Sequence, residues 1–265
     1  MRLVPLEDGL IEEAQREVMR YLLSADWNVS PPEMDYAVQA IIRRYAGGDP
    51  YAEVKRRSNE EALRLYGRCK DLIMGSQDPL KTSIKIAIAG NVIDFGPYTS
   101  YDLEGTLNRL LNSELRVDHY EAFKREFERA SSVLYFSDNA GEIVFDKLLL
   151  ETMMGMRDLR VTFVVKGGPM INDATLEDFE QVSLSRLPGV DVRVVSNGEP
   201  GTGPDRRSEE VRRWLKEHDL VISKGQGNYE ILGELSGIFH MLVVKCAVVA
   251  RDLGVEQGDA ILLHR

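Results

Sequence analysis

The sequence predicts an α/β protein in which an all-helical N-terminal region precedes a Rossmann-like, mostly parallel sheet with helices on both faces. Apolar residues recur at helical spacing from Leu10 to about Gly90. Beyond Asp118, short apolar segments rich in β-branched residues alternate with helical or loop sequence, which is typical of parallel strands joined by right-handed crossovers. We therefore expect a helical region over residues 1–117 that contributes to a wall of the functional site, and a Rossmann-like α/β domain over residues 118–265.

The helical region contains recognisable helix boundaries. Pro31 and Pro32 open the second expected helix, and the run Gly47-Gly48-Asp49-Pro50 closes it, as expected of a helix stop followed by a restart. The segment from Ser83 to Asp94 is ambiguous, because its isoleucines alternate as in a strand while several of its residues also share a helical face. We favour a helix for this segment.

The sheet is predicted from short strands that follow one more amphipathic helix, which carries Tyr120, Phe123 and Phe127. The expected strands are Val133 to Phe136, Val161 to Val165, Val190 to Val195, Leu220 to Ser223, Leu242 to Cys246 and Ala260 to Leu263. We expect the last of these strands at the edge of the sheet.

Composition and charge disfavour several classes of protein. Lys and Arg number 33 against 43 Asp and Glu, and the resulting net charge of -10 disfavours nucleic acid as a partner. No apolar run approaches the roughly 20 residues that a membrane span needs, and the N-terminus lacks the order of a signal peptide. We therefore expect a cytoplasmic protein without a membrane partner. The two cysteines, Cys69 and Cys246, lie far apart and form no Cys-X-X-Cys site.

Oxygen-bearing side chains follow two of the expected strands. Asp138 and Asn139 come directly after the first strand, and the loop from Lys166 to Asp173 after the second strand also ends on an Asn-Asp pair. Open α/β sheets bind ligands at the carboxyl ends of their strands, and carboxylate and amide oxygens suit Mg²⁺, Mn²⁺ or a similar divalent ion. Alternatively, Asp138 or Asn139 merely caps the following helix.

Two glycine-rich loops, each opening with a lysine, also follow strands: Lys166-Gly167-Gly168 and Lys224-Gly225-Gln226-Gly227-Asn228. Such loops can direct backbone N–H groups at a phosphate, and a lysine adds a point charge. Neither loop is a Walker A motif or a dinucleotide fingerprint. Each loop could therefore be a plain turn and its lysine a surface residue, but their position beside the acidic loops favours an anion site.

Five motifs resemble those of the metal-dependent damage-control phosphatases, formerly domain of unknown function 89, which share a metal-binding domain with acidic-residue methyltransferase proteins. In chain order they are DPYAEVKRRSNEEAL (Asp49 to Leu63), AIAGNVIDFG (Ala87 to Gly96), SDNAGEIVFDK (Ser137 to Lys147), VKGGPMINDAT (Val165 to Thr175) and SKGQGNYE (Ser223 to Glu230). The resemblance covers most of the chain and implies a helical N-terminal part packed on a Rossmann-like sheet.

The resemblance also implies roles for individual residues. It makes Asp138, Asn139 and Asp173 the catalytic, metal-binding residues, holding one divalent ion (Mg, Mn, Co or Ni), and it places Lys224 on the substrate phosphate. The residues expected around the substrate are Asn91, Asp94, Glu142, Lys166 and Lys224. Many stand-alone microbial members carry an N-terminal Cys-X-X-Cys pair, where this chain has Leu6 and Gly9.

We therefore expect a divalent-metal-dependent phosphatase that hydrolyses small phosphorylated metabolites, such as sugar phosphates or phosphorylated cofactor intermediates. The nucleophile would be a metal-activated water or the Asp138 carboxylate. Two alternatives belong to other classes: an S-adenosylmethionine-dependent carboxyl methyltransferase, and a non-catalytic metal or metabolite sensor. Against the methyltransferase, SDNAGE follows the first strand where a Gly-X-Gly loop would be expected.

Overall fold

A sheet of seven strands runs through the protein, whose computed structural model describes residues 4–29, 31–91, 105, 111, 113–196 and 208–265. Within these ranges the strand order is β1-β7-β6-β5-β2-β3-β4, and every neighbouring pair is parallel except β6 with β7. The strands are β1 (Val117–Asp118), β2 (Ser132–Phe136), β3 (Arg160–Lys166), β4 (Val190–Val195), β5 (Leu220–Lys224), β6 (Ile238–Val243) and β7 (Ala260–His264). The predicted fold class, a mostly parallel α/β sheet, is confirmed.

Both faces of the sheet are covered, which explains why most residues of its central strands are apolar. In β2 every residue is buried: Val133 and Tyr135 belong to the core on one face, and Leu134 and Phe136 belong to the core on the other. Successive side chains of a strand point to opposite faces, so a strand buried on both sides shows no polar alternation.

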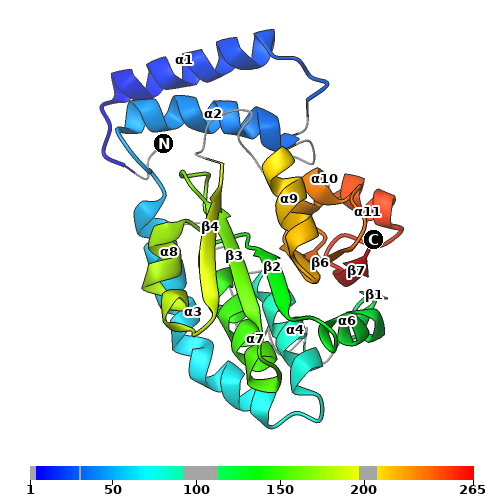
Figure 1. Cartoon of the computed structure of the whole chain (residues 1–265). Helices are drawn as coiled ribbons and strands as arrows, with labels where there is room; N and C mark the ends of the chain where they lie inside the picture. Colours follow the sequence, from blue (N-terminus) through cyan, green and yellow to red (C-terminus); the bar gives the residue numbers. More distant parts are fainter. Residues whose placement is uncertain (1–3, 30, 92–104, 106–110, 112, 197–207) are drawn as a thin grey trace.

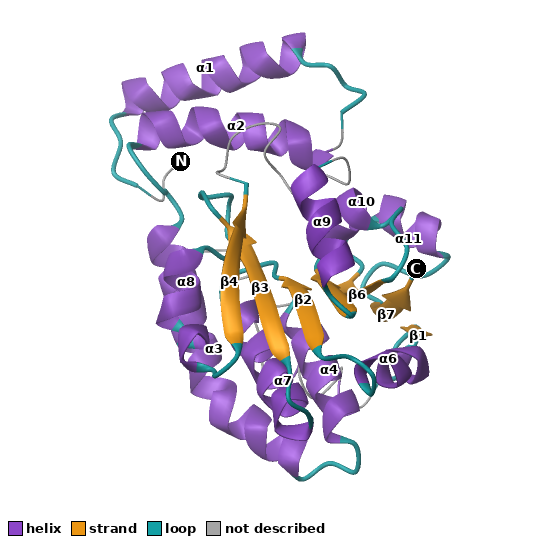
Figure 2. Ribbon diagram, viewed as in Figure 1, coloured by secondary structure: helices purple, strands orange, loops and turns teal. Residues whose placement is uncertain are grey.

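Helices form the two covering layers (Figure 2). The larger core packs the sheet against α3 (Ala52–Met74), α4 (Pro79–Gly90), α6 (Tyr120–Phe127), α7 (Glu142–Met156) and α8 (Leu176–Gln181), with the short 3-10 turn η1 (Leu184–Arg186) beside it. The opposite face is covered by α9 (Glu209–Glu217), α10 (Gln226–Leu232) and α11 (Ala247–Leu253). None of the described helices combines the length and apolarity that crossing a bilayer requires.

The ambiguous segment after Ser83 is helical as far as Gly90, as favoured above. Helix α4 begins at Pro79 behind the N-cap Asp78, whose side chain accepts a hydrogen bond from the Lys81 amide at 3.0 Å. Its isoleucines Ile84, Ile86 and Ile88 are all fully buried, although Lys81, Thr82 and Lys85 are partly exposed. A helix with only a narrow polar face buries apolar residues at alternating positions, so its sequence can imitate the alternation of a strand.

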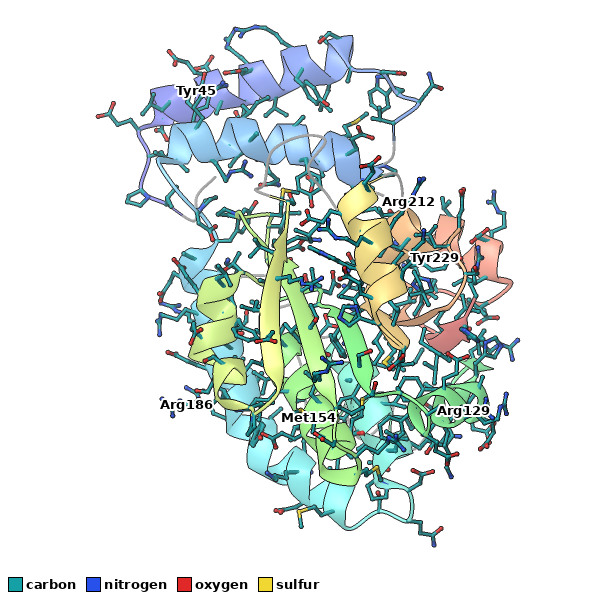
Figure 3. All side chains as sticks on the ribbon, viewed as in Figure 1. Tyr45, Arg129, Met154, Arg186, Arg212 and Tyr229 are labelled. Atoms are coloured by element: carbon teal, nitrogen blue, oxygen red, sulfur yellow. The ribbon has the colours of Figure 1, made fainter. Side chains whose placement is uncertain are left out.

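The N-terminal helices divide into two parts. Helices α3 and α4 share one continuous core with the sheet, so the expected boundary at residue 117 does not separate two cores. Helices α1 (Asp8–Ser24) and α2 (Pro31–Ala46) instead form a hairpin beyond one end of the sheet (Figure 1). Tyr45, labelled in Figure 3, joins the two helices by donating a hydrogen bond to Glu17 Oε2 at 2.9 Å.

Two strand predictions need correction. Strand β6 spans Ile238–Val243 rather than Leu242 to Cys246, because its register is set by pairing with β5, and Cys246 is the N-cap of α11. Strand β7 matches its predicted range closely but is not the outermost strand. It pairs antiparallel with β6 on one side and with the two-residue β1 on the other.

Candidate functional site

The two acidic loops meet at the carboxyl ends of β2 and β3. An isolated antiparallel bridge pairs Asn139 with Asp173. On either side of it, the Ala140 amide donates to Asn172 O and the Ala174 amide donates to Asp138 O, both at 2.8 Å. These backbone hydrogen bonds bring together the Asp138-Asn139 and Asn172-Asp173 pairs that the sequence analysis singled out. Capping alone does not account for this arrangement, since α7 begins behind Gly141 and has no side-chain cap of its own.

Asn91 reaches the same site from α4, of which it is the C-cap. Its Nδ2 donates to Asp138 Oδ2 at 2.9 Å and to Glu142 Oε2 at 3.0 Å. Asn139 Nδ2 donates to the same two oxygens at 2.8 and 3.3 Å. The structure thus brings Asn91, Asn139 and Glu142 together around the Asp138 carboxylate. Asp94, the other residue expected here, lies outside the described residues.

Lys224 lies behind this group and does not line the cavity that Asp138 and Asp173 face. Its ammonium donates to Glu142 Oε1 at 2.6 Å, to Asp146 Oδ1 at 2.5 Å and to Ala87 O at 2.9 Å, and its side chain is fully buried. Three acceptors use all three protons of a lysine ammonium. The prediction that Lys224 contacts the substrate phosphate is therefore corrected: in this structure it holds Glu142 in place. The buried Lys224 ammonium offsets the charge of Glu142 and Asp146. The sequence alone did not show that these two acidic residues are buried beside it.

Lys166 is the lysine that faces the open site. It lies at the end of β3, its Nζ is 3.6 Å from Asp173 Oδ2, and it lines a cavity of about 290 Å³ together with Asp138 and Asp173. Burial alone would lower the pKa of Lys166, but the neighbouring Asp173 and Asp138 raise it above its ordinary value. Lys166 therefore stays protonated and presents a positive charge to this cavity.

The opposite wall of the cavity comes from α2 and α10. The wall residues are Pro31, Pro32, Asp35, Tyr36, Gly227, Asn228, Glu230 and Ile231. Arg43 of α2 also donates to Pro169 O at 2.7 Å, which ties this helix to the loop that carries Asp173. The sequence analysis did not identify the α2 residues as part of the site, because Pro31 and Pro32 indicated only the start of a helix.

The environment of the site raises the pKa values of its carboxyl groups. Burial, followed by the neighbouring Glu142 and Asp173, raises the pKa of Asp138 to about 8. Burial also raises the pKa of Asp173, although Lys166 opposes that effect. Burial and the neighbouring carboxylates both disfavour the charged form of Asp138, and a bound cation would offset both effects.

Three of the candidate ligands would supply oxygen to a metal ion: Asp138, Asp173 and the Asn139 amide. Among the residues that the structure describes, no three His, Cys, Asp or Glu side chains form a metal-ligating cluster. Any metal at this site would therefore depend on an amide oxygen in addition to two carboxylates, a mixture typical of hard divalent ions.

Gly225 allows the loop after β5 to approach Asp138 closely. It has φ +80°, and a Cβ built on it would lie 1.9 Å from Asp138 Oδ2. We expect Gly225→Ala to displace the Asp138 carboxylate, to lower the activity of the site at least tenfold and to destabilise the fold by about 1–2 kcal/mol, the cost of a side chain at positive φ.

The matched control is Gly237→Ala, which has the same φ of +80° but nothing within 4 Å of the added Cβ. Gly237→Ala should lose only the stability that positive φ costs, whereas Gly225→Ala should lose somewhat more because the Asp138 carboxylate must also move. Loss of activity should be confined to Gly225→Ala. Equal activities in the two variants would show that the close approach to Asp138 has no functional consequence.

Comparison with known proteins identifies the family to which the chain is similar. The family model described as the damage-control phosphatase ARMT1-like domain matches residues 6–261. A damage-control phosphatase from Archaeoglobus fulgidus is 35% identical, with 98% of this chain and 92% of the relative covered. Damage-control phosphatase PH1575 from Pyrococcus horikoshii is 35% identical over 82% of this chain and 75% of its own.

A solved structure supports the same relationship. The crystal structure of a DUF89 family protein, PH1575 from Pyrococcus horikoshii, superimposes with a TM-score of 0.83 at 30% sequence identity, covering 99% of this chain and 92% of the other. The shared fold therefore extends over both the sheet and the N-terminal helices.

Proposed function

Because the chain belongs to the damage-control phosphatase ARMT1-like family, we propose that it is a divalent-metal-dependent phosphatase that acts on small phosphorylated metabolites. Sugar phosphates and phosphorylated cofactor intermediates are the substrates proposed. The observation that carries the proposal is the bridge between Asn139 and Asp173, which joins the two acidic loops at a cavity faced by Lys166.

The residues at this bridge suit a divalent metal. Asp138 and Asp173 would hold one Mg²⁺, Mn²⁺, Co²⁺ or Ni²⁺ ion with their carboxylates, and Asn139 would add a neutral oxygen. Burial raises the pKa of both Asp138 and Asp173, and for Asp138 the neighbouring carboxylates Glu142 and Asp173 add to it. A bound cation would offset both effects, which supports the assignment. When bound, such an ion supplies charge neutralisation and lowers the pKa of a coordinated water.

The remaining residues would bind and orient the substrate. Lys166, which faces the cavity, would hold the phosphate oxygens as a point charge. Asn91 would keep Asp138 and Glu142 in position through its two donated hydrogen bonds. The first turn of α7 contributes little to phosphate binding, since the amides of Gly141, Ile143 and Val144 already donate within the protein.

Metal removal tests the proposal directly. We expect purified protein to release inorganic phosphate from a panel of phosphorylated metabolites, to lose at least about 90% of that activity after chelation, and to regain it with one or more of Mg²⁺, Mn²⁺, Co²⁺ and Ni²⁺. The measurement is colorimetric phosphate release in metal-stripped and reloaded protein. Full activity in the stripped protein would contradict the metal requirement.

The same preparation separates the alternatives. Transfer of a labelled methyl group from S-adenosylmethionine to a carboxylate, without phosphate release, would identify a methyltransferase instead. Metal binding without turnover of any phosphate ester would identify a sensor.

A further inference from the structure

Helix α3 carries the sequence motif from Asp49 to Leu63, which the proposed chemistry leaves without a role. Asn59 lies in this motif and its side chain is fully buried. Its Oδ1 accepts a hydrogen bond from the Gly141 amide at 2.6 Å, and its Nδ2 donates to Asp178 Oδ1 at 2.9 Å and to Gln181 Oε1 at 2.8 Å. These three hydrogen bonds fix the orientation of the amide group.

The hydrogen bond to Gly141 has a local cause. Gly141 is the N-cap of α7, has φ +80° and carries no side chain that could cap the helix. The N-terminal amides of a helix need acceptors from elsewhere when the helix supplies none. Asn59 supplies one from a different helix, two residues after the Asp138-Asn139 pair.

The Nδ2 group of Asn59 is connected, through Asp178, to the loop that carries Asp173. Asp178 accepts hydrogen bonds from the backbone and hydroxyl of Thr175, both at 2.8 Å, and forms an ion pair with the buried Lys55 at 3.3 Å. Thr175 lies two residues after Asp173. Asn59 thus connects the end of the Asp138 loop to the end of the Asp173 loop.

We propose that Asn59 is a positioning residue that holds the loop of Asp138 in register with the loop of Asp173. Its amide acts on both loops through Gly141 and Asp178 and touches neither acid directly. The expected effect on metal binding rests on the proposed function, whereas the effect on the loop itself does not.

The test compares Asn59→Leu, which keeps the branched shape of the side chain but removes both hydrogen-bonding groups, with Ser58→Ala. Ser58 is a buried neighbour on the same helix whose hydroxyl bonds only within α3, to Val54 O at 2.9 Å. In the full-length protein, hydrogen exchange of the peptide containing Gly141 should become about tenfold faster in Asn59→Leu, the effect of losing one buried hydrogen bond. It should be unchanged in Ser58→Ala.

The second readout is Mn²⁺ affinity, measured by electron paramagnetic resonance well below the unfolding temperature. Loss of a supporting residue should weaken Mn²⁺ binding about 10–100-fold in Asn59→Leu and less than twofold in Ser58→Ala. If the wild-type protein binds no Mn²⁺, the proposal that the site holds a divalent metal fails. Hydrogen exchange of the peptide containing Gly141 still tests the role of Asn59 in that case.

The proposal would be overturned by unchanged exchange at Gly141 in a folded Asn59→Leu protein. If that variant fails to fold, Asn59→Ser provides the same two readouts with a smaller perturbation. Failure of both variants to fold would also overturn it, because Asn59 would then be required for the fold rather than for the position of the loops.

Discussion

Asp138→Asn should abolish most phosphatase activity, lowering kcat by about a hundredfold or more, while the protein stays folded. The substitution removes a negative charge without changing the size of the side chain. Asp138 Oδ2 accepts hydrogen bonds from Asn91 and Asn139, and the oxygen of an introduced amide can still accept them. The loss should therefore concern the chemistry and the affinity for a divalent ion, and not the packing around the site.

The measurements are steady-state phosphate release, Mn²⁺ affinity and thermal unfolding. Asp191→Asn is the matched control, because it makes the same chemical change at an exposed position of β4 outside the cavity. The control should retain wild-type values of all three quantities. An Asp138→Asn protein with more than a tenth of the wild-type kcat would remove Asp138 from the catalytic group.

Lys224→Ala should destabilise the protein by about 3–5 kcal/mol, the cost of breaking a buried ion pair by removing one partner. Lys224 lies between Glu142 and Asp146, and all three side chains are buried from solvent. Burial alone would lower the pKa of Lys224, but Asp146 and Glu142 raise it, so the ammonium is charged in the folded protein. Its removal leaves two neighbouring carboxylates without a cation.

Chemical denaturation measures this effect, and Lys166→Ala is the informative comparison. Lys166 faces the cavity, so its removal should reduce turnover by about a hundredfold with a smaller loss of stability. The opposite pattern, with wild-type stability in Lys224→Ala and wild-type turnover in Lys166→Ala, would restore Lys224 as the phosphate-binding lysine.

Lys166 and Lys224 could not be assigned to different roles from their local sequences. Both follow a strand and precede a glycine, so their local sequences are equivalent. The difference comes from their partners: Lys166 meets Asp173 at the cavity, whereas Lys224 meets Asp146, which lies in the middle of α7. No local pattern marks Asp146 as buried, because an acidic residue inside a helix is ordinarily exposed.

The ends of strand β6 could likewise not be predicted from its local sequence. The apolar residues from Leu242 to Cys246 favour a strand by composition, but β6 begins at Ile238, where it pairs with β5, and ends at Val243, which pairs with Ala260 at the start of β7. Hydrogen-bond register is a property of two strands, so it cannot be read from one of them.

By itself, the sequence determined the α/β class and the two acidic loops, because each depends on periodicity or on residue types at a strand end. For the segment after Ser83 the sequence favoured a helix over a strand, and the structure decided between them. Only the tertiary structure decided which lysine faces the cavity, that α2 forms its far wall, and that Asn59 caps the helix after Asp138. These features join residues that are distant in the chain. Their contacts arise from packing between elements, which local sequence patterns do not encode.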